Sequence, residues 1–430
     1  MRNFLNILFA IFIVLSPRQV FSQNTINLID LYKAVDLNNP LSKIPEGIDS
    51  IYQLKKKNLN VNYLPKFDLN ASSTWQSEVS ALNVDIPSNI NISLPKPDKD
   101  QYKVALDVSQ LIWDGGSTKA KEELEDLNQI LEQNRVEVEI YSIKDRITNL
   151  YFNLLTLKVT ENQLNLMLSD LDKRKVELES SVNAGYILSS TLDGIKAEKL
   201  KLLQSIDAVP SQRKTLISSL KSLTGIMLSD NDIFILPNPD SIKELTCMRP
   251  EFEGFKYQQN VMNASSSLIA RKRYPVLAGF ASAGYGKPGL NMLSNNWNTY
   301  YMFGAKLSWN IWDWNSVRKD KQQLKVQENL VDYRKQAYID SYQAQIESIT
   351  LEIQKLNNQL SKDYEIVKLL HQVTERSASS LKNGTITSAV YLADFNSESR
   401  SQLELELRKI KISLQKVLLY NISGNELIIK

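Results

Sequence analysis

The second half of this chain of 430 residues repeats the first half, with landmarks at a constant offset. Asp114, in the stretch LIWDG, corresponds to Asp313, in the stretch NIWDW, 199 residues later. Gly185 and Gly384 are separated by the same interval. Pro65 has its counterpart 210 residues later, so the first half carries 11 extra residues before Asp114. Two copies of a unit this long predict one duplicated architecture rather than two unrelated domains.

Composition and charge exclude several classes of function. The chain has 51 Lys and Arg against 48 Asp and Glu. These charges are interleaved, so the sequence offers no concentrated basic patch to nucleic acid. The single cysteine, Cys247, allows neither an intrachain disulfide nor a cysteine-based metal cluster. The sequence contains no nucleophile paired with a base and no set of metal ligands. We therefore expect no enzyme activity, no cofactor and no metal site.

His371 is the only histidine, which leaves little room for histidine-dependent catalysis. It follows Val367 by four residues on an apolar stripe, so we interpret it as a packed or interfacial residue. A ligand or a proton switch is the alternative. The stretch Gly284-Tyr285-Gly286 leads into a polar loop, so it lacks the helix that a nucleotide-binding loop requires.

The first 22 residues have the pattern of an export signal. Arg2 is the charged start, residues 5–15 are mostly apolar, and Ser22 precedes an expected cleavage site before Gln23. The apolar run is too short for a convincing spanning helix, although an uncleaved anchor is the alternative. No later run of about eighteen apolar residues follows. Any membrane segment of the mature chain must therefore consist of β-strands.

Each half is expected to contain a long helix and a helix that returns beside it. Residues from about 117 to 180 and from 317 to 380 contain no proline or glycine, and their apolar residues recur in steps of three and four. Helices this long must run beside other long helices, as in a coiled coil. Returning helices are expected over about 191–223 and 388–422. Pro210 should kink or break the first of these, because proline lacks an N–H donor.

Four strands are expected before the long helices, over about 66–76, 101–112, 276–285 and 300–311. Apolar residues alternate with polar ones in three of them, which is the pattern of a barrel with lipid outside and water inside. All six tryptophans fall in or beside these segments, as in an aromatic girdle. The alternative is that tryptophan simply favours strands. The residues expected to face lipid or the membrane interface are Trp75, Val104, Leu106, Val108, Trp113, Tyr301, Phe303, Leu307 and Trp309.

The chain is thus predicted to be mainly α with a membrane β-barrel portion, in two tandem repeats of short helix, β-hairpin and long helical hairpin. Only Ile51 to Asn60 forms an amphipathic lead-in to the first strand. The expected segments are a signal peptide (1–22), repeat 1 (23–225, hairpin about 117–225), an equatorial linker (226–248), repeat 2 (249–424, hairpin about 317–422) and a C-terminal tail (425–430).

This ordered set resembles the TolC family of trimeric outer-membrane channels, also called outer-membrane factors. The features that carry the resemblance are Arg249-Pro250-Glu251 at the start of repeat 2, the Tyr-Leu-Pro or Tyr-Pro entries to the first strands, the LIWDGG stretch, and the glycine turns at Gly185 and Gly384. Each motif alone is common in proteins, whereas the ordered set, present twice, is specific. The resemblance extends from about Ile26 to Gly424.

The resemblance implies a homotrimer in the bacterial outer membrane, in which each protomer gives four strands to one twelve-stranded barrel and its helices to a periplasmic tube. An iris would close the tube, an inner-membrane pump would supply the energy, and a periplasmic adaptor would dock at the hairpin tips. The implied docking residues are Gly185, Tyr186, Ile187, Leu188, Gly384, Thr385 and Ile386. Candidate iris contacts are Arg376, Tyr391, Asp394 and Arg400, with solvated surface charges as the alternative.

The chain departs from the family near the tips. Many members carry an aspartate six residues after each tip glycine, where this chain has Thr191 and Val390. The part that tip carboxylates take in the family's closed iris or in cation binding therefore does not carry over to Thr191 or Val390. Asp193 and Asp394 are nearby substitutes.

The predicted function is a passive exit duct of a tripartite efflux or type I secretion system. A periplasmic adaptor and an inner-membrane pump would open it. The alternative is a periplasmic coiled-coil scaffold or adhesin without a pore. A scaffold would have no use for alternating strands and clustered tryptophans.

Overall fold

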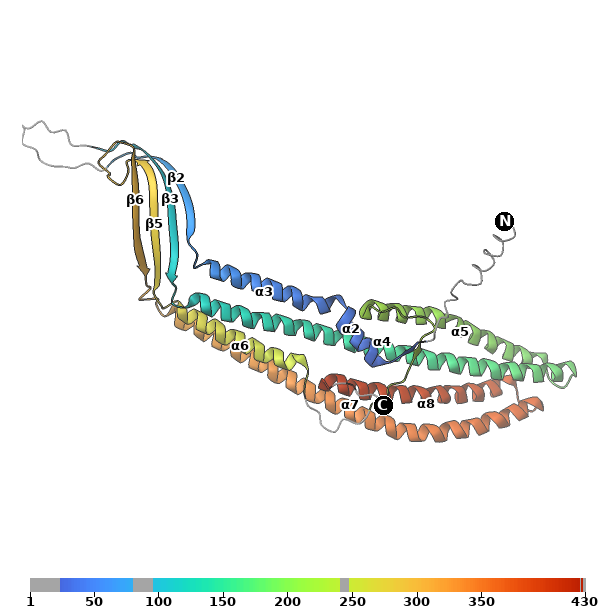
Figure 1. Cartoon of the computed structure of the whole chain (residues 1–430). Helices are drawn as coiled ribbons and strands as arrows, with labels where there is room; N and C mark the ends of the chain where they lie inside the picture. Colours follow the sequence, from blue (N-terminus) through green and yellow to red (C-terminus); the bar gives the residue numbers. More distant parts are fainter. Residues whose placement is uncertain (1–23, 80–95, 240–246, 426, 428–430) are drawn as a thin grey trace, which may run out of the picture. The chain divides into compact units, whose positions relative to one another are not determined.

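The computed structural model describes residues 24–79, 96–239, 247–425 and 427. The expected signal peptide (1–22) lies outside the described residues, as do parts of the 226–248 linker and of the 425–430 tail. The elements, in chain order, are β1 (Thr25–Ile26), α2 (Leu28–Asn38), the 3-10 helix η1 (Pro40–Lys43), α3 (Ile44–Val61), β2 (Lys66–Trp75), β3 (Asp100–Trp113), α4 (Ser117–Asn183), α5 (Ser189–Thr224), β4 (Ile233–Phe234), α6 (Pro250–Arg271), β5 (Val276–Lys287), β6 (Asn298–Ser308), α7 (Ser316–Lys382) and α8 (Ser388–Ser423) (Figure 1).

Contacts within the chain define two compact units. The hairpin unit contains the described parts of residues 1–42, 139–249 and 341–430. The sheet unit contains the described parts of residues 43–138 and 250–340. Helices α4 and α7 contribute residues to both units.

The sheet unit is built on one antiparallel sheet with the strand order β2-β3-β5-β6 (Figure 1). Leu69 lies opposite Leu106, Leu106 opposite Ala283, and Ala283 opposite Tyr301. Residues directly opposite each other across a sheet share one face, so these four form a single row. The neighbouring row on that face consists of Phe67, Val108, Ala281 and Phe303. One apolar face therefore runs across all four strands.

The other face of the sheet is polar in its middle. Asp68 lies opposite Asp107, and Asp107 lies opposite Ser282. The Asn70 amide donates to the Asp107 carboxylate at 2.7 Å, so the polar groups of this face bond one another. An apolar face and a polar face on the same strands are what the alternation of residue types predicts.

Strand β6 ends at Ser308, three residues before the expected limit of 311. Trp309 therefore lies beyond the strand, and the expectation that it is a strand residue was wrong. Its indole N–H donates to the carbonyl of Arg273 at 3.0 Å. Trp75 and Trp113 are the last residues of β2 and β3.

The two long helices, α4 and α7, have 67 residues each, and the returning helices α5 and α8 have 36 each. Pro210 lies inside α5 without breaking it, so the alternative that it breaks the helix was wrong. Its exposed position explains this, because the carbonyl that loses an N–H partner can bond water. The lead-in to the first strand is also longer than Ile51 to Asn60, since it contains both α2 and α3.

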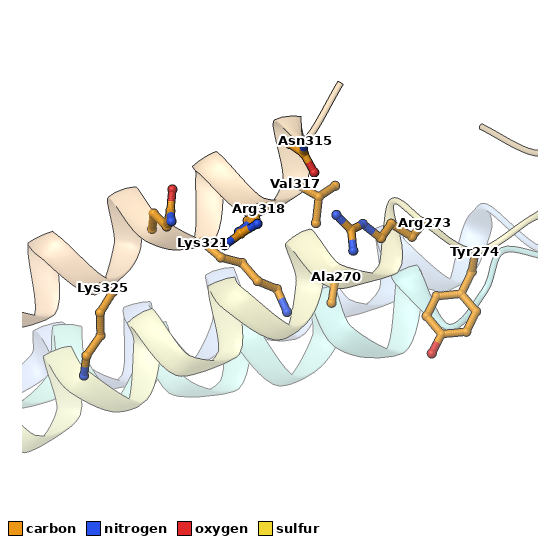
Figure 2. Close-up of a pocket in the computed structure, with 9 residues that line it drawn as sticks. Ala270, Arg273, Tyr274, Asn315, Val317, Arg318, Lys321 and Lys325 are labelled. Carbon is orange, nitrogen blue, oxygen red and sulfur yellow. The ribbon is translucent and has the colours of Figure 1, made fainter. Parts of the chain in front are cut away.

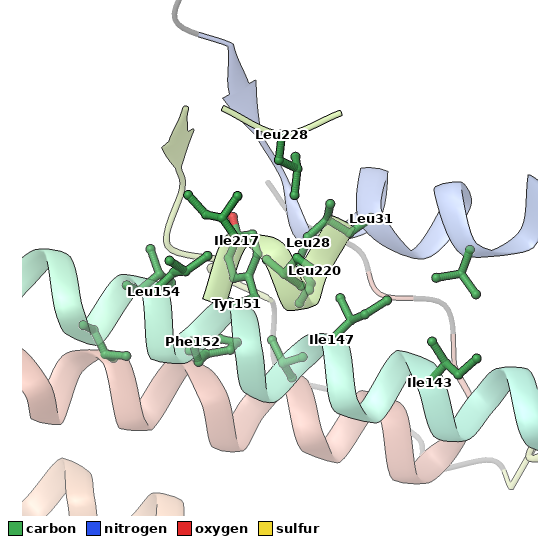
Figure 3. Packing of buried hydrophobic residues seen from close by; sticks show 14 residues of the cluster. Leu28, Leu31, Ile143, Ile147, Tyr151, Phe152, Leu154, Ile217, Leu220 and Leu228 are labelled. Carbon is green, nitrogen blue, oxygen red and sulfur yellow. The ribbon is translucent and has the colours of Figure 1, made fainter. Parts of the chain in front are cut away.

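The main core of the hairpin unit gathers around the middle of α4 (Figure 3). Leu28 and Leu31 of α2 are fully buried there with Ile147 of α4 and Leu220 of α5. The ring of Tyr151 is buried in the same cluster, and its hydroxyl lies 2.9 Å from the Ile26 carbonyl oxygen and 2.6 Å from that of Ile235. One α4 side chain thus ties the segments of the small β1–β4 sheet to the helices. Within the described part of the chain, no helix combines the length and the apolar character needed to cross a membrane.

Candidate functional site

The two helical hairpins turn in the same way at their tips. Gly185 has φ +75° and Gly384 has φ +71°, in the left-handed region that glycine adopts without strain. The N–H of Tyr186 donates to the Ser181 carbonyl at 2.9 Å, and that of Thr385 donates to the Ser380 carbonyl at 3.0 Å. The N–H of each glycine donates to the carbonyl of the residue that follows Ser181 or Ser380 in the chain. The two bonds at each turn together make a Schellman motif. These bonds satisfy the last carbonyls of α4 and α7.

The apolar residues at the tips differ in their exposure. The side chains of Tyr186 and Leu188 are 82% and 76% exposed. Ile187 and Ile386 are instead partly buried against a second core cluster that includes Leu381 and Tyr391. Isoleucine at these turns holds the hairpin together, which leaves Tyr186 and Leu188 as the large apolar side chains presented to solvent.

The two tips lie against each other. A side chain at Gly384 would come within 3.5 Å of the Tyr186 carbonyl oxygen. At Gly194 of α5 a Cβ atom would come within 2.8 Å of the Ser388 hydroxyl of α8, a distance that real Cβ atoms do not reach. Gly194 therefore lets α5 approach the start of α8 closely. The tips of both repeats therefore form one continuous surface.

The four candidate iris residues divide into two groups. Arg376 and Arg400 are exposed, and Arg400 lies 4.0 Å from the Glu404 carboxylate one turn away. Tyr391 is fully buried, and its ring stacks on that of Phe395. Burial raises the pKa of Tyr391, although the nearby Arg174 acts to lower it. Asp394 accepts a hydrogen bond from the Ser377 hydroxyl of α7. Tyr391 and Asp394 thus contribute to packing within the single chain.

His371 belongs to a polar network that the sequence did not predict. Its Nδ1 lies 2.8 Å from the carboxylate of Glu398, which is buried on α8. Gln402 also donates to that carboxylate at 2.9 Å, and Gln163 of α4 donates to the side-chain oxygen of Gln402 at 2.9 Å. The hydrogen bond to Glu398 raises the pKa of His371. The imidazole itself is exposed, so His371 is not packed in the core of this chain, and its interpretation as an interfacial residue stays a prediction.

The long helices α4 and α7 begin with the same turn but with different residues. Asp114 and Asp313 each accept backbone N–H groups of the first helical turn. After Asp114 the chain has Gly115 and Gly116, with φ +69° and +79°. At the corresponding places after Asp313 it has Trp314 and Asn315, with φ +52° and +61°. Non-glycine residues are disfavoured in this region, most of all bulky ones.

A groove lies in the sheet unit between the end of α6 and the start of α7 (Figure 2). It has a volume of about 710 Å³ and is lined by Ala270, Arg273, Tyr274, Asn315, Val317, Arg318, Lys321, Gln322 and Lys325. Four of these side chains are cations and none is a carboxylate. A sequence signal for this groove existed, because Arg318, Lys321 and Lys325 are spaced to share one face of a helix.

The comparisons with known proteins bear on the fold. No family model matches the chain, and no curated protein sequence does. Among solved structures, CusC superposes with a TM-score of 0.72 at 12% identity, covering 93% of this chain and 92% of CusC. VceC, an outer-membrane protein of Vibrio cholerae, gives 0.68 at 15% identity, covering 93% and 96%. The MtrE outer-membrane channel of Neisseria gonorrhoeae gives 0.65 at 14% identity, covering 93% and 89%.

These structures bear out the resemblance at the level of the fold. CusC is described as forming a transmembrane channel, and MtrE was solved in an open state. The expected likeness to the outer-membrane factor channels of the TolC family is therefore confirmed for a mostly helical chain with one four-stranded sheet, whereas the closed barrel, the repeat layout and the trimer stay predictions.

Proposed function

We propose that this chain is one protomer of a TolC-like outer-membrane channel, which serves as the passive exit duct of a tripartite efflux or type I secretion system. Its strands would lie in the bacterial outer membrane and its helices in the periplasm. The observation that carries the proposal is the four-stranded sheet with one apolar face and two open edges, in a fold shared with outer-membrane channels.

The sheet supports insertion only as part of a larger assembly. Among the residues that the structure describes, β2 and β6 are edge strands, and each has a neighbour in the sheet on one side only. In a bilayer the open edges would leave backbone N–H and carbonyl groups without partners, at a cost of several kcal/mol for each group. Three copies placed edge to edge give twelve strands and close the ring. The apolar face, with Leu106 and Phe303, would face lipid, and the face with Asp68 and Asp107 would face water.

The long helix α7 supports self-association. Val326, Leu330 and Tyr333 are exposed at steps of four and three in the sheet unit. Ile366, Leu369 and Val373 are exposed in the same way in the hairpin unit. An apolar stripe on a helix normally meets a partner. A neighbouring protomer is the partner that a closed helical tube provides.

The hairpin tips are the proposed docking surface for a periplasmic adaptor. Tyr186 and Leu188 give it exposed apolar area, and Gly185, Gly384 and Thr385 are also exposed. Ile187 and Ile386 would act by holding the turns in shape. The exposed cations Arg376 and Arg400 are the proposed iris contacts between protomers, and Tyr391 and Asp394 would position α8 behind them.

The transport step in this proposal needs no chemistry from the chain. The adaptor and pump would open the periplasmic end, and the exported compound would leave through the water-filled interior. Selectivity and energy would come from the inner-membrane pump.

Electron microscopy of protein extracted with detergent from outer-membrane fractions tests the proposal. Hollow particles with threefold symmetry are the expected result. Water-soluble monomers or dimers without a lumen would overturn it and favour the periplasmic scaffold or adhesin.

A further inference from the structure

The basic groove between α6 and α7 has the charge of an anion-binding site. Its four cations, Arg273, Arg318, Lys321 and Lys325, line one volume without a carboxylate among them. Figure 2 shows the side chains of Lys321 and Lys325 extending from α7 toward α6. Clustered charges of one sign in a concave surface raise the local concentration of the opposite ion.

Two of the four cations are not neutralised by ion pairs. Arg273 lies 3.7 Å from the Asp313 carboxylate, and Lys325 lies 2.7 Å from that of Glu328. In the part of the chain that the structure describes, no ion pair involves Arg318 or Lys321, and both are exposed. These two residues are therefore the cations most available to an external anion.

Beside the groove, the chain between β6 and α7 exposes a cluster of aromatic and aliphatic side chains. Trp309, Ile311, Trp312 and Trp314 are all more than half exposed. Trp312 and Trp314 meet edge to face, with 5.8 Å between ring centroids. The left-handed backbone of Trp314 is disfavoured for tryptophan, and the first repeat has a glycine there. Backbone strain at an exposed residue indicates a role other than packing.

Exposed indoles and cations at the end of a strand have a common explanation in the chemistry of a bilayer surface. Tryptophan rings lie at the level of the lipid headgroups, and lysine and arginine meet the headgroup phosphates. We infer that the groove and the neighbouring Trp312 and Trp314 bind the phosphate headgroup of an anionic phospholipid. The inference rests on the proposed placement in the outer membrane. A free phosphate ion would use the same cations but would have no use for the exposed indoles.

Native mass spectrometry of the full-length protein in a neutral detergent tests this inference. The probes are phosphatidylglycerol, phosphatidylcholine and inorganic phosphate, each added separately. The test variant is Arg318→Gln with Lys321→Gln. The matched control is Lys319→Gln with Arg334→Gln, which removes one lysine and one arginine from exposed positions of α7 that do not line the groove.

The wild type should retain phosphatidylglycerol in preference to phosphatidylcholine. The test variant should bind phosphatidylglycerol roughly thirtyfold more weakly, since each cation near a lipid surface contributes about 1 kcal/mol and a factor of ten corresponds to 1.4 kcal/mol. The control should stay within about twofold of the wild type. Equal loss in both variants, or no loss in either, would overturn the inference.

The phosphate arm separates the two sources of the anion. If inorganic phosphate binds wild type as tightly as phosphatidylglycerol, the groove is a site for free anions and the lipid assignment is wrong. Electron microscopy of the same samples separates this failure from failure of the proposed channel. Hollow threefold particles without a preference for phosphatidylglycerol would overturn this inference alone. Protein that does not associate with membranes would overturn both.

Discussion

The carboxylates of Asp114 and Asp313 make equivalent contacts at the starts of the two 67-residue helices. Asp114 accepts the N–H of Thr118 at 2.6 Å, and Asp313 accepts that of Val317 at 3.1 Å. Each acceptor satisfies a donor that has no partner within the helix, which is the role of an N-cap residue. The duplication visible in the sequence is therefore a repeated local structure, in which a strand ends and a long helix begins.

Replacing Asp114 and Asp313 by alanine should lower the stability of the protein by different amounts. Asp114→Ala should destabilise the protein by about 1–3 kcal/mol, and Asp313→Ala should destabilise it by less. Asp114 is the more buried of the two and also accepts the Tyr63 hydroxyl at 2.9 Å. Thermal unfolding of the purified protein measures the difference. Asp114→Asn keeps a capping side chain and should recover most of the loss, whereas equal losses in the two alanine variants would contradict this account.

Trp314→Gly should raise stability while weakening lipid binding. Glycine removes the cost of holding tryptophan in a left-handed conformation, a gain of about 1 kcal/mol. The same change removes an exposed indole beside the basic groove. Thermal unfolding and retention of phosphatidylglycerol are the two measurements. Asn315→Gly is the control, because asparagine tolerates this conformation and the gain should be smaller. A loss of stability in Trp314→Gly would mean that the indole packs against a partner.

The pH dependence of stability should include a contribution from His371. The hydrogen bond to Glu398 raises the pKa of His371 above its ordinary value of 6.5, so the protonated form is favoured in the folded state. The stabilisation is therefore complete below pH 6.5 and is lost as the pH rises through the folded-state pKa. Glu375 and Asp170 also favour the cation.

His371→Gln isolates that contribution. Wild type should lose more thermal stability than the variant between pH 5.5 and pH 8.5, and the exposure of the imidazole keeps the difference small. Glu398→Gln should give the same flattened profile, since it removes the carboxylate that favours the charged imidazole. Identical pH profiles for wild type and His371→Gln would show that the contact does not stabilise the folded protein.

Substitutions at the first hairpin tip should affect adaptor docking and the stability of the fold differently, depending on the residue that is replaced. Tyr186→Ala with Leu188→Ala should change stability by no more than about 0.5 kcal/mol, because both side chains are exposed. The same variant should lower adaptor-dependent export. Ile187→Ala should instead destabilise the hairpin by about 1–3 kcal/mol, because this side chain packs into the core. The sensitivity profile of cells that carry each variant, compared with that of a deletion strain, and thermal unfolding of the protein provide the two readouts. Normal export by the double variant would remove the tip from the proposed docking surface.

A charge on the apolar face of the sheet should prevent insertion. Leu106→Lys should destabilise the membrane-inserted sheet by about 2–4 kcal/mol if this face meets lipid near the middle of the bilayer. Ser109→Lys is the matched control, because it lies on the same strand on the face that already carries Lys103. The amount of protein in outer-membrane fractions is the measurement. Equal amounts of both variants would favour a water-exposed sheet.

The sequence by itself determined the features that depend on local backbone chemistry. The absence of proline and glycine from 117–180 indicated the long helix α4, and Gly185 and Gly384 marked turns that need a left-handed residue. The alternation in β3 and β6 indicated which residues share a face, because side chains on a strand point alternately to opposite sides. These properties do not depend on what the element packs against.

Tertiary structure decided the features that depend on which side chains meet. Ile187 is partly buried and Tyr186 is exposed because only Ile187 faces the second core cluster, and the chemistry of the turn does not specify that difference. His371 has a carboxylate partner because α8 returns beside α7 and brings Glu398 within 2.8 Å. Arg273 joins Arg318 and Lys321 because α6 and α7 lie side by side (Figure 2). Contacts between residues far apart in the chain depend on the register of packed helices, which the periodicity of a single sequence does not specify.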